Sequence, residues 1–183
     1  MPVENLRFVV LASLMAALTA LGAYIHVPIG PVPIVLSTLF VFLSGLLLGS
    51  RWGVASMGLY LFVGAIGIPV FSGGRGGAAH FLGPTGGYLF GYVVASWLTG
   101  IFSERSRGML LIEIVGVVIG SLAIYGLGLP WLKITTQMSW PKALSAGMLP
   151  FLIGDAVKAT VALILARAMR PMLYRQLQSS AHT

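Results

Sequence analysis

Residues Gly108–Leu129 read GMLLIEIVGVVIGSLAIYGLGL, an apolar run in which Glu113 is the one charged side chain. A transmembrane helix needs about 20 such residues, because each adds about 1.5 Å and the hydrocarbon core of a bilayer is about 30 Å thick. The whole chain has the same character, since 57% of its 183 residues are hydrophobic and 8% are charged. Soluble domains carry roughly a quarter charged residues. The sequence therefore predicts an integral membrane protein.

Glycine, proline and charged residues divide the chain into six apolar stretches, and we expect each to be a transmembrane helix. Six spans use about 120 residues and leave no room for a separate catalytic or nucleotide-binding domain. We predict one all-α domain, residues 1–183, built as a bundle of six transmembrane helices. The stretches are Leu6–Tyr24, Val35–Gly49, Trp52–Ile68, Thr85–Phe102, Gly108–Leu129 and Leu149–Met169.

Basic residues are distributed unevenly between the two sides of this arrangement. Seven fall on the side of the termini, three fall on the other side, and Lys158 lies inside the last span. Cytoplasmic loops accumulate Lys and Arg, so both termini are predicted to be cytoplasmic and the protein to lie in the cytoplasmic membrane. The same rule explains the net charge of +7 without a nucleic-acid partner. The seven are Arg7, Arg51, Arg105, Arg107, Arg167, Arg170 and Arg175, and the three are Arg75, Lys133 and Lys142.

Motifs for catalysis and metal binding are missing from the sequence. It contains no cysteine, no phosphate-binding G-x-x-x-x-G-K-[S/T] loop and no H-E-x-x-H pair, and its three histidines lack metal-ligand spacing. We therefore predict no enzyme activity, no metal and no cofactor. Glu113 is expected near the cytoplasmic surface beside Arg105 or Arg107, in preference to a proton-relay role.

Asp155 and Lys158 are the strongest functional signal in the sequence. They lie three residues apart on one face of the last predicted helix. Each charge opposes insertion by about 2.5–3.5 kcal/mol near the bilayer centre, so their face must turn into the bundle or a wet cavity. We predict that the pair binds a polar or anionic solute, with Lys158 for a carboxylate and Asp155 for N–H donors. The alternative is an ion pair that only fixes helix packing.

The outer connections are the expected place for such a site. Gly-Pro turns follow the first, third and fifth predicted helices, at Gly30-Pro31, Gly67-Ile68-Pro69 and Gly128-Leu129-Pro130. The stretch Ser72–Gly83 contains five glycines, which allow close approach of the backbone to a ligand. Arg75 in this stretch either guides an anion to the site or lies in water.

A stripe of small residues, Ala12, Ala16 and Ala20, lies along the first predicted helix. Small residues at this spacing allow two helix backbones to approach closely in a membrane. The stripe is either packing within the bundle or a docking surface for another membrane subunit.

Several motifs together resemble the BioY family, the biotin-binding S-components of energy-coupling factor (ECF) transporters. They are Gly30-Pro31-Val32-Pro33-Ile34 with Ser37-Thr38-Leu39, the run from Gly67 to Gly74, the run from Gly83 to Leu89, and Gly154-Asp155-x-x-Lys158. The resemblance extends from the first predicted helix to the sixth. It implies a six-helix bundle with a biotin site near the outer face, closed by the first and third loops.

The same resemblance implies roles for individual residues and partners. Asp155 and Lys158 would be polar ligands of biotin, and Thr38, Phe71 and Tyr88 would line the pocket. The alanine stripe would dock a transmembrane coupling protein, which works with two ATPase subunits. At position 37 this chain has Ser where the family more often has Gln. At position 75 it has Arg where a smaller polar residue is expected in the family. Both departures bear on the contacts to the ureido ring.

Two other functions are compatible with the residues alone. One is a proton-coupled secondary carrier that works by itself, with Asp155 or Glu113 titrating. The other is a structural membrane subunit without a ligand.

Overall fold

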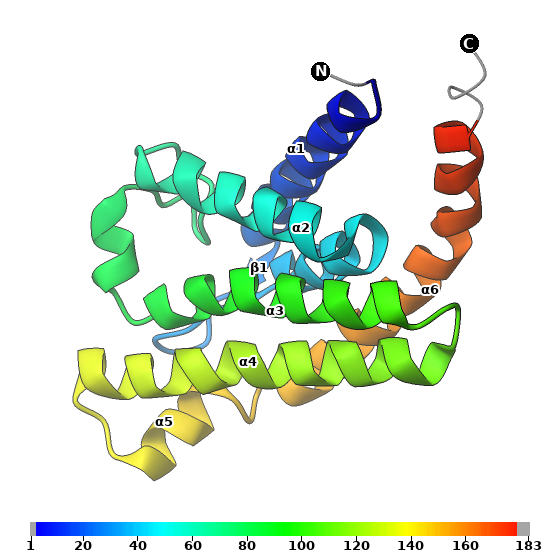
Figure 1. The fold of residues 1–183 in the computed structure, drawn as a ribbon. Coiled ribbons are helices and arrows are strands. Elements are labelled where there is room, and N and C mark those ends of the chain that lie inside the picture. The colour runs from blue at the N-terminus through cyan, green and yellow to red at the C-terminus, as the bar shows by residue number, and fades with distance from the viewer. Residues whose placement is uncertain (1–2, 179–183) are drawn as a thin grey trace.

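The computed structural model describes residues 3–178, so the two ends of the predicted 1–183 domain lie outside the described part. Within it the chain is almost entirely helical, which confirms the all-α prediction, with a two-stranded antiparallel sheet in addition (Figure 1). The elements are α1 (Val3–Tyr24), β1 (His26–Val27), β2 (Ile34–Val35), α2 (Ser37–Ala65), the 3-10 helix η1 (Ala78–Leu82), α3 (Gly86–Arg105), α4 (Leu110–Thr136), α5 (Trp140–Gly147) and α6 (Leu152–Gln178).

Several of these helices are long and apolar enough to cross a membrane. Among the described residues, α1, α2 and α4 each meet that condition, and α5 with α6, bent by 45° at their junction, form a possible fourth span. In Figure 1 the turn between α3 and α4 lies at the right, and η1 and α5 lie at the left. The loops that follow α2 and α4 are therefore gathered at one end of the molecule.

Helix α2 is broken at Gly49, whose φ of 77° and ψ of −175° are not helical. A side chain there would be strained, and its Cβ would overlap the Glu104 carboxylate. That carboxylate accepts a hydrogen bond from the Ser50 backbone N–H over 2.7 Å, so it caps the second half of the helix. The break divides α2 into residues 37–48 and 50–65 and falls one residue before the boundary predicted at Ser50-Arg51.

The largest departures from the predicted helices lie in the last third of the chain. Helix α4 does not end at Leu129 but continues through Pro130 to Thr136; the proline removes one backbone donor, which transmembrane helices tolerate. The predicted Gly-Pro turn at this point is therefore wrong. The short helix α5 was not predicted, although Pro141 stands in its first turn, where proline is favoured. Helix α6 begins at Leu152, three residues later than predicted, and continues past Pro171.

Packing within the bundle is uneven. Helix α3 lies between α2 and α4 and packs extensively on both, and α1 packs on α2. Helix α6 packs on α2 but hardly touches α4. The core is therefore centred on the two halves of α2.

The alanine stripe of α1 faces that core. Ala12 and Ala16 are 4% and 6% exposed and belong to the buried cluster, and Ala20 is half-buried beside it. The close approach that the stripe predicts thus occurs within the bundle. Whether the stripe also docks a partner subunit stays a prediction.

Candidate functional site

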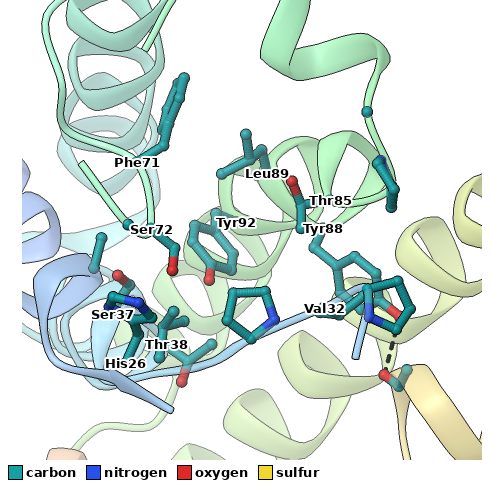
Figure 2. A pocket seen from close by; sticks show the side chains of 18 of the residues that line it. His26, Val32, Ser37, Thr38, Phe71, Ser72, Thr85, Tyr88, Leu89 and Tyr92 are labelled. Atoms are coloured by element: carbon teal, nitrogen blue, oxygen red, sulfur yellow. Dashed lines mark hydrogen bonds between the residues drawn. The ribbon is translucent and has the colours of Figure 1, made fainter. Parts of the chain in front are cut away.

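A cavity of about 550 Å³ lies at the end of the bundle where the loops gather. Small-molecule sites fall in the range of about 300–1,000 Å³. Its walls come from segments between Ala23 and Lys158, so nearly the whole chain contributes to it (Figure 2). The polar lining residues are His26, Ser37, Thr38, Tyr60, Ser72, Arg75, His80, Thr85, Tyr88, Tyr92, Tyr125, Asp155 and Lys158.

All six predicted substrate-binding residues line this one cavity. They come from the start of α2, the loop after α2, the start of α3 and the start of α6. No two of these segments are adjacent in the sequence, so the fold brings them together. The six are Thr38, Phe71, Arg75, Tyr88, Asp155 and Lys158.

Asp155 and Lys158 form an ion pair in the first two turns of α6, with Lys158 Nζ 2.5 Å from Asp155 Oδ1. Lys158 also donates to the backbone carbonyl oxygen of Val35 in β2, over 2.9 Å. The Tyr125 hydroxyl of α4 donates to the other carboxylate oxygen of Asp155. The side chains of Lys158 and Asp155 are only 9% and 17% exposed. Each still has hydrogen-bonding capacity to offer a ligand, because a carboxylate accepts about four bonds and an ammonium donates three.

Phe71 forms the aromatic centre of the loop that covers the cavity. Its side chain is fully buried, and its ring stacks on His80 with centroids 4.9 Å apart. The edges of Tyr60 and Phe81 complete the cluster. Gly64 at the end of α2 makes room for this ring, because a Cβ there would overlap it.

The loop Ser72–Gly83 turns back on itself directly after Phe71. The Phe71 backbone N–H donates to the Arg75 carbonyl oxygen over 2.8 Å, which places Arg75 at the cavity wall. His80 contacts Thr85 Oγ1 at 3.2 Å. Burial, followed by the nearby Arg75 charge, lowers the pKa of His80. The loop therefore presents one fixed positive charge and an aromatic surface to the cavity.

Tyr88 and Tyr92 lie one turn apart on the face of α3 that borders the cavity (Figure 2). The Tyr88 hydroxyl donates to the Gly147 carbonyl oxygen over 2.9 Å and so ties α3 to the end of α5. Tyr92, which is 6% exposed, was not singled out from the sequence. Its spacing of four residues from Tyr88 is the signal that could have found it.

Thr38, in the first turn of α2, carries a buried hydroxyl for which the described residues provide no hydrogen-bond partner. An unpaired buried hydroxyl costs about 1–3 kcal/mol. A polar ligand in the cavity would remove that cost. The neighbouring Ser37 differs, because its hydroxyl donates to the Thr19 carbonyl oxygen over 2.9 Å and helps to fix α1 against α2.

Glu113 is not among the residues that line this cavity and lies in the first turn of α4, near the expected end of its helix, but its partners differ from the predicted ones. It is fully buried, and its partners are Arg167, with Nη1 3.3 Å from Oε2, and Arg170. Arg105 and Arg107 are not its partners. Sequence distance hid the cluster, since the two arginines follow 54 and 57 residues later.

Comparison with known proteins gives a consistent result. The sequence model of the BioY family matches residues 1–175. The chain belongs to the BioY family. It is 42% identical over 160 residues to the probable biotin transporter BioY of Pyrococcus horikoshii, covering 87% of this chain and 94% of the relative. It is 36% identical over 167 residues to the biotin transporter BioY of Thermotoga maritima, covering 91% and 98%.

A solved structure agrees with the same family. The crystal structure of the S-component for biotin from an ECF-type ABC transporter superposes with a TM-score of 0.87 and 29% identity, covering 93% of this chain and 94% of that one. The BioY resemblance and the fold class read from the motifs are thereby confirmed. The chain is a multi-pass membrane protein of a transporter family.

The BioY-type motifs now have positions in the molecule. Gly30 to Pro33, Phe71 to Gly73, and Gly83 to Thr85 all line the cavity. Both departures from the family pattern, Ser37 and Arg75, line it too. Arg75 brings a charge to the wall, whereas Ser37 is neutral. The Ser37 hydroxyl already donates its hydrogen bond to the Thr19 carbonyl oxygen.

Proposed function

We propose that this protein captures biotin in the cavity and delivers it across the cytoplasmic membrane as the substrate-binding subunit of an ECF-type transporter. Both termini are cytoplasmic in this proposal, and the cavity opens to the outside. The observation that carries it is the Asp155–Lys158 ion pair at the wall of a closed-in aromatic cavity.

The polar groups of the cavity match the two ends of biotin. The ureido ring of biotin presents N–H donors, for which the Asp155 carboxylate has acceptor capacity beyond its bonds to Lys158 and Tyr125. Lys158 lies 2.5 Å from Asp155, so its remaining donor capacity serves the same end of the ligand, where the ureido ring also presents a carbonyl oxygen. The biotin tail ends in a carboxylate, for which Arg75, on a different segment of the wall, supplies positive charge. Hydrogen bonds to charged groups contribute about 1.5–3 kcal/mol each. The arrangement therefore favours a ligand that is a donor at one end and an anion at the other.

The remaining wall suits the apolar body of the ligand. The aromatic rings of Phe71, Tyr88 and Tyr92 line the cavity. The prolines of the loop before β2 form the rest of this apolar wall. Burial of apolar surface contributes about 25 cal/mol per Å². Thr38 offers one further hydrogen bond.

Energy for transport comes from partners in this proposal. The chain lacks a phosphate-binding loop, and we propose one transmembrane coupling protein and two ATPase subunits as those partners. Transport driven by a proton gradient alone is the competing function.

Direct binding of labelled biotin to the purified protein in detergent tests the proposal. Saturable binding that unlabelled biotin displaces supports it, and no binding at any concentration refutes it. Uptake into ATP-free vesicles driven by a pH gradient would favour the secondary carrier instead.

A further inference from the structure

A second hollow, of about 430 Å³, lies between α4 and α6 and is separate from the candidate site. Its walls are apolar except at Thr160 and Arg167, and the Thr160 hydroxyl is already bonded to Ala156 of its own helix. We call it the α4–α6 groove. Its other main lining residues are Leu110, Ile114, Val118, Leu163 and Ile164.

The groove is open on the outer side of the bundle. Helix α6 packs on α2, and its backbone seldom comes close to that of α4. The described side chains that join the two helices include Tyr125–Asp155 and Glu113–Arg167. Val118 and Ile164 on its two walls are 52% and 62% exposed. In a membrane-spanning bundle these side chains face hydrocarbon, so an acyl chain fits the groove without any polar cost.

The groove is long enough to hold an acyl chain as long as half of the hydrocarbon core. It runs along α6 from Ala156 to Arg167. This is about 16 Å at 1.5 Å per residue. Half of a hydrocarbon core of about 30 Å is about 15 Å. An acyl chain lying in the groove would therefore place its headgroup beside Arg167.

Arg167 lies beside the start of α4. Its Nη2 donates to the carbonyl oxygen of Gly108, in the turn just before α4, over 2.9 Å. Its side chain is 41% exposed. Glu113 pairs with both Arg167 and Arg170, so one carboxylate faces two guanidinium groups. Among the described residues, Glu113 is the one carboxylate that pairs with these two guanidinium groups, so one positive charge is left over at this end of the groove.

We propose that the α4–α6 groove binds an anionic phospholipid, with one acyl chain along the groove and the headgroup phosphate at Arg167. Guanidinium groups bind phosphate oxygens through charge-assisted hydrogen bonds. Basic pockets between transmembrane helices hold anionic headgroups in the same way. A zwitterionic phospholipid fits the apolar groove equally well but gains less from the unpaired charge.

Native mass spectrometry of the whole protein, released from micelles containing phosphatidylglycerol or phosphatidylcholine, tests the proposal. The wild type should retain one phosphatidylglycerol in preference to phosphatidylcholine. Arg167→Gln should lower that preference by about fivefold, the factor for one basic residue beside an anionic lipid. Arg105→Gln is the matched control, because it removes the same charge from an exposed position at the same end, outside the groove. This control should change the preference for phosphatidylglycerol by less than twofold, which corresponds to less than about 0.4 kcal/mol.

A second pair of variants tests the groove itself. Thr160→Phe fills it and should abolish retention of both lipids. Ser13→Phe is matched, since Ser13 is also exposed and also bonds the carbonyl four residues before it, but on α1; it should leave retention unchanged. Equal retention of the two lipids, an equal effect of Arg105→Gln and Arg167→Gln, or unchanged retention in Thr160→Phe would each overturn the proposal. If Thr160→Phe keeps its lipid but no longer co-purifies with a coupling subunit, the groove is a protein interface instead.

Discussion

The Lys158 ammonium donates a hydrogen bond to the Val35 carbonyl oxygen over 2.9 Å, which fastens the start of α6 to the second strand of the hairpin. Lys158 is at the same time the partner of Asp155. The pair is thus both a cavity wall and a structural link between segments that are 123 residues apart. These two roles make different predictions for single and double variants.

Lys158→Met should weaken biotin binding by roughly ten- to a hundredfold, because it removes a charge-assisted contact of about 1.5–3 kcal/mol. It also leaves Asp155 without its ion-pair partner, which typically costs about 3–5 kcal/mol of stability. The double variant Asp155→Leu with Lys158→Met should recover much of the stability and still fail to bind. Thermal stability and biotin titration on the three variants check this. A stable double variant that binds biotin as tightly as the parent would refute the site assignment.

Gly64→Ala should destabilise the protein by about 1–3 kcal/mol and lower its biotin affinity, because the new Cβ pushes the Phe71 ring into the cavity. Gly58→Ala is the control in the same half of α2, since no atom lies within 4 Å of a Cβ built there. It should stabilise the helix by about 0.5–1 kcal/mol. Unfolding and biotin titration measure both. Equal effects of the two substitutions would show that Phe71 does not depend on Gly64.

Glu113→Gln should lower the free energy of unfolding by about 3–5 kcal/mol, because it leaves two arginines facing a neutral side chain. Biotin affinity should stay unchanged, since the cluster lies at the other end of α4 from Tyr125, about 18 Å along the helix. Glu104→Gln, an exposed carboxylate that caps Ser50, should cost about 1 kcal/mol. A loss of biotin affinity in well-folded Glu113→Gln would contradict the separation of cluster and cavity and revive the proton-relay interpretation.

His80 should make the protein less stable in mild acid. Its pKa is lowered in the folded state, first by burial and then by Arg75, so the unfolded chain takes up this proton at a higher pH than the folded chain. The free energy of unfolding should therefore fall as the pH drops below about 6.5. His80→Phe keeps a ring to stack on Phe71 but cannot titrate. Between about pH 7.5 and 5.5 the wild type should lose more thermal stability than this variant. Parallel pH profiles would show that His80 does not contribute.

The orientation in the membrane can be tested by thiol labelling, because the chain has no cysteine of its own. Ser72→Cys, in the loop at the cavity, should react with an impermeant reagent added outside intact cells. Arg107→Cys, in the turn between α3 and α4, should react only after the cells are opened. The reverse pattern would place the cavity on the cytoplasmic side.

The sequence predicted the features that depend on local pattern. Apolar runs located the helices, and the position of Ser50 located the break in α2 to within one residue, since Gly49 supplies the positive φ there. The spacing of Asp155 and Lys158 indicated a shared face, and the structure brings that pair to the cavity.

The features that sequence reasoning missed depend on distant partners or on context. The partners of Glu113 follow more than fifty residues later, so nearer arginines were preferred. Pro130 was interpreted as a helix end, although α4 continues through it. Ala16 belongs to a stripe that suits an internal or an external neighbour equally, and its burial in the bundle could not be read from the sequence. Tyr92 lies one helical turn from Tyr88, but this spacing alone does not separate a cavity-lining aromatic residue from a core one.

The bend at Gly49 divides α2 into two helical arms that meet at this residue. Thr38 lies near the tip of one arm and Tyr60 near the tip of the other, and both border the cavity. The arms are joined by a single non-helical residue at the far end of the molecule. Each arm is roughly 18 Å or more in length at 1.5 Å per residue. A change of a few degrees in the angle at Gly49 would therefore displace the two cavity-lining ends by a larger distance, and the Glu104 carboxylate, which accepts hydrogen bonds from Ser50, lies beside that bend.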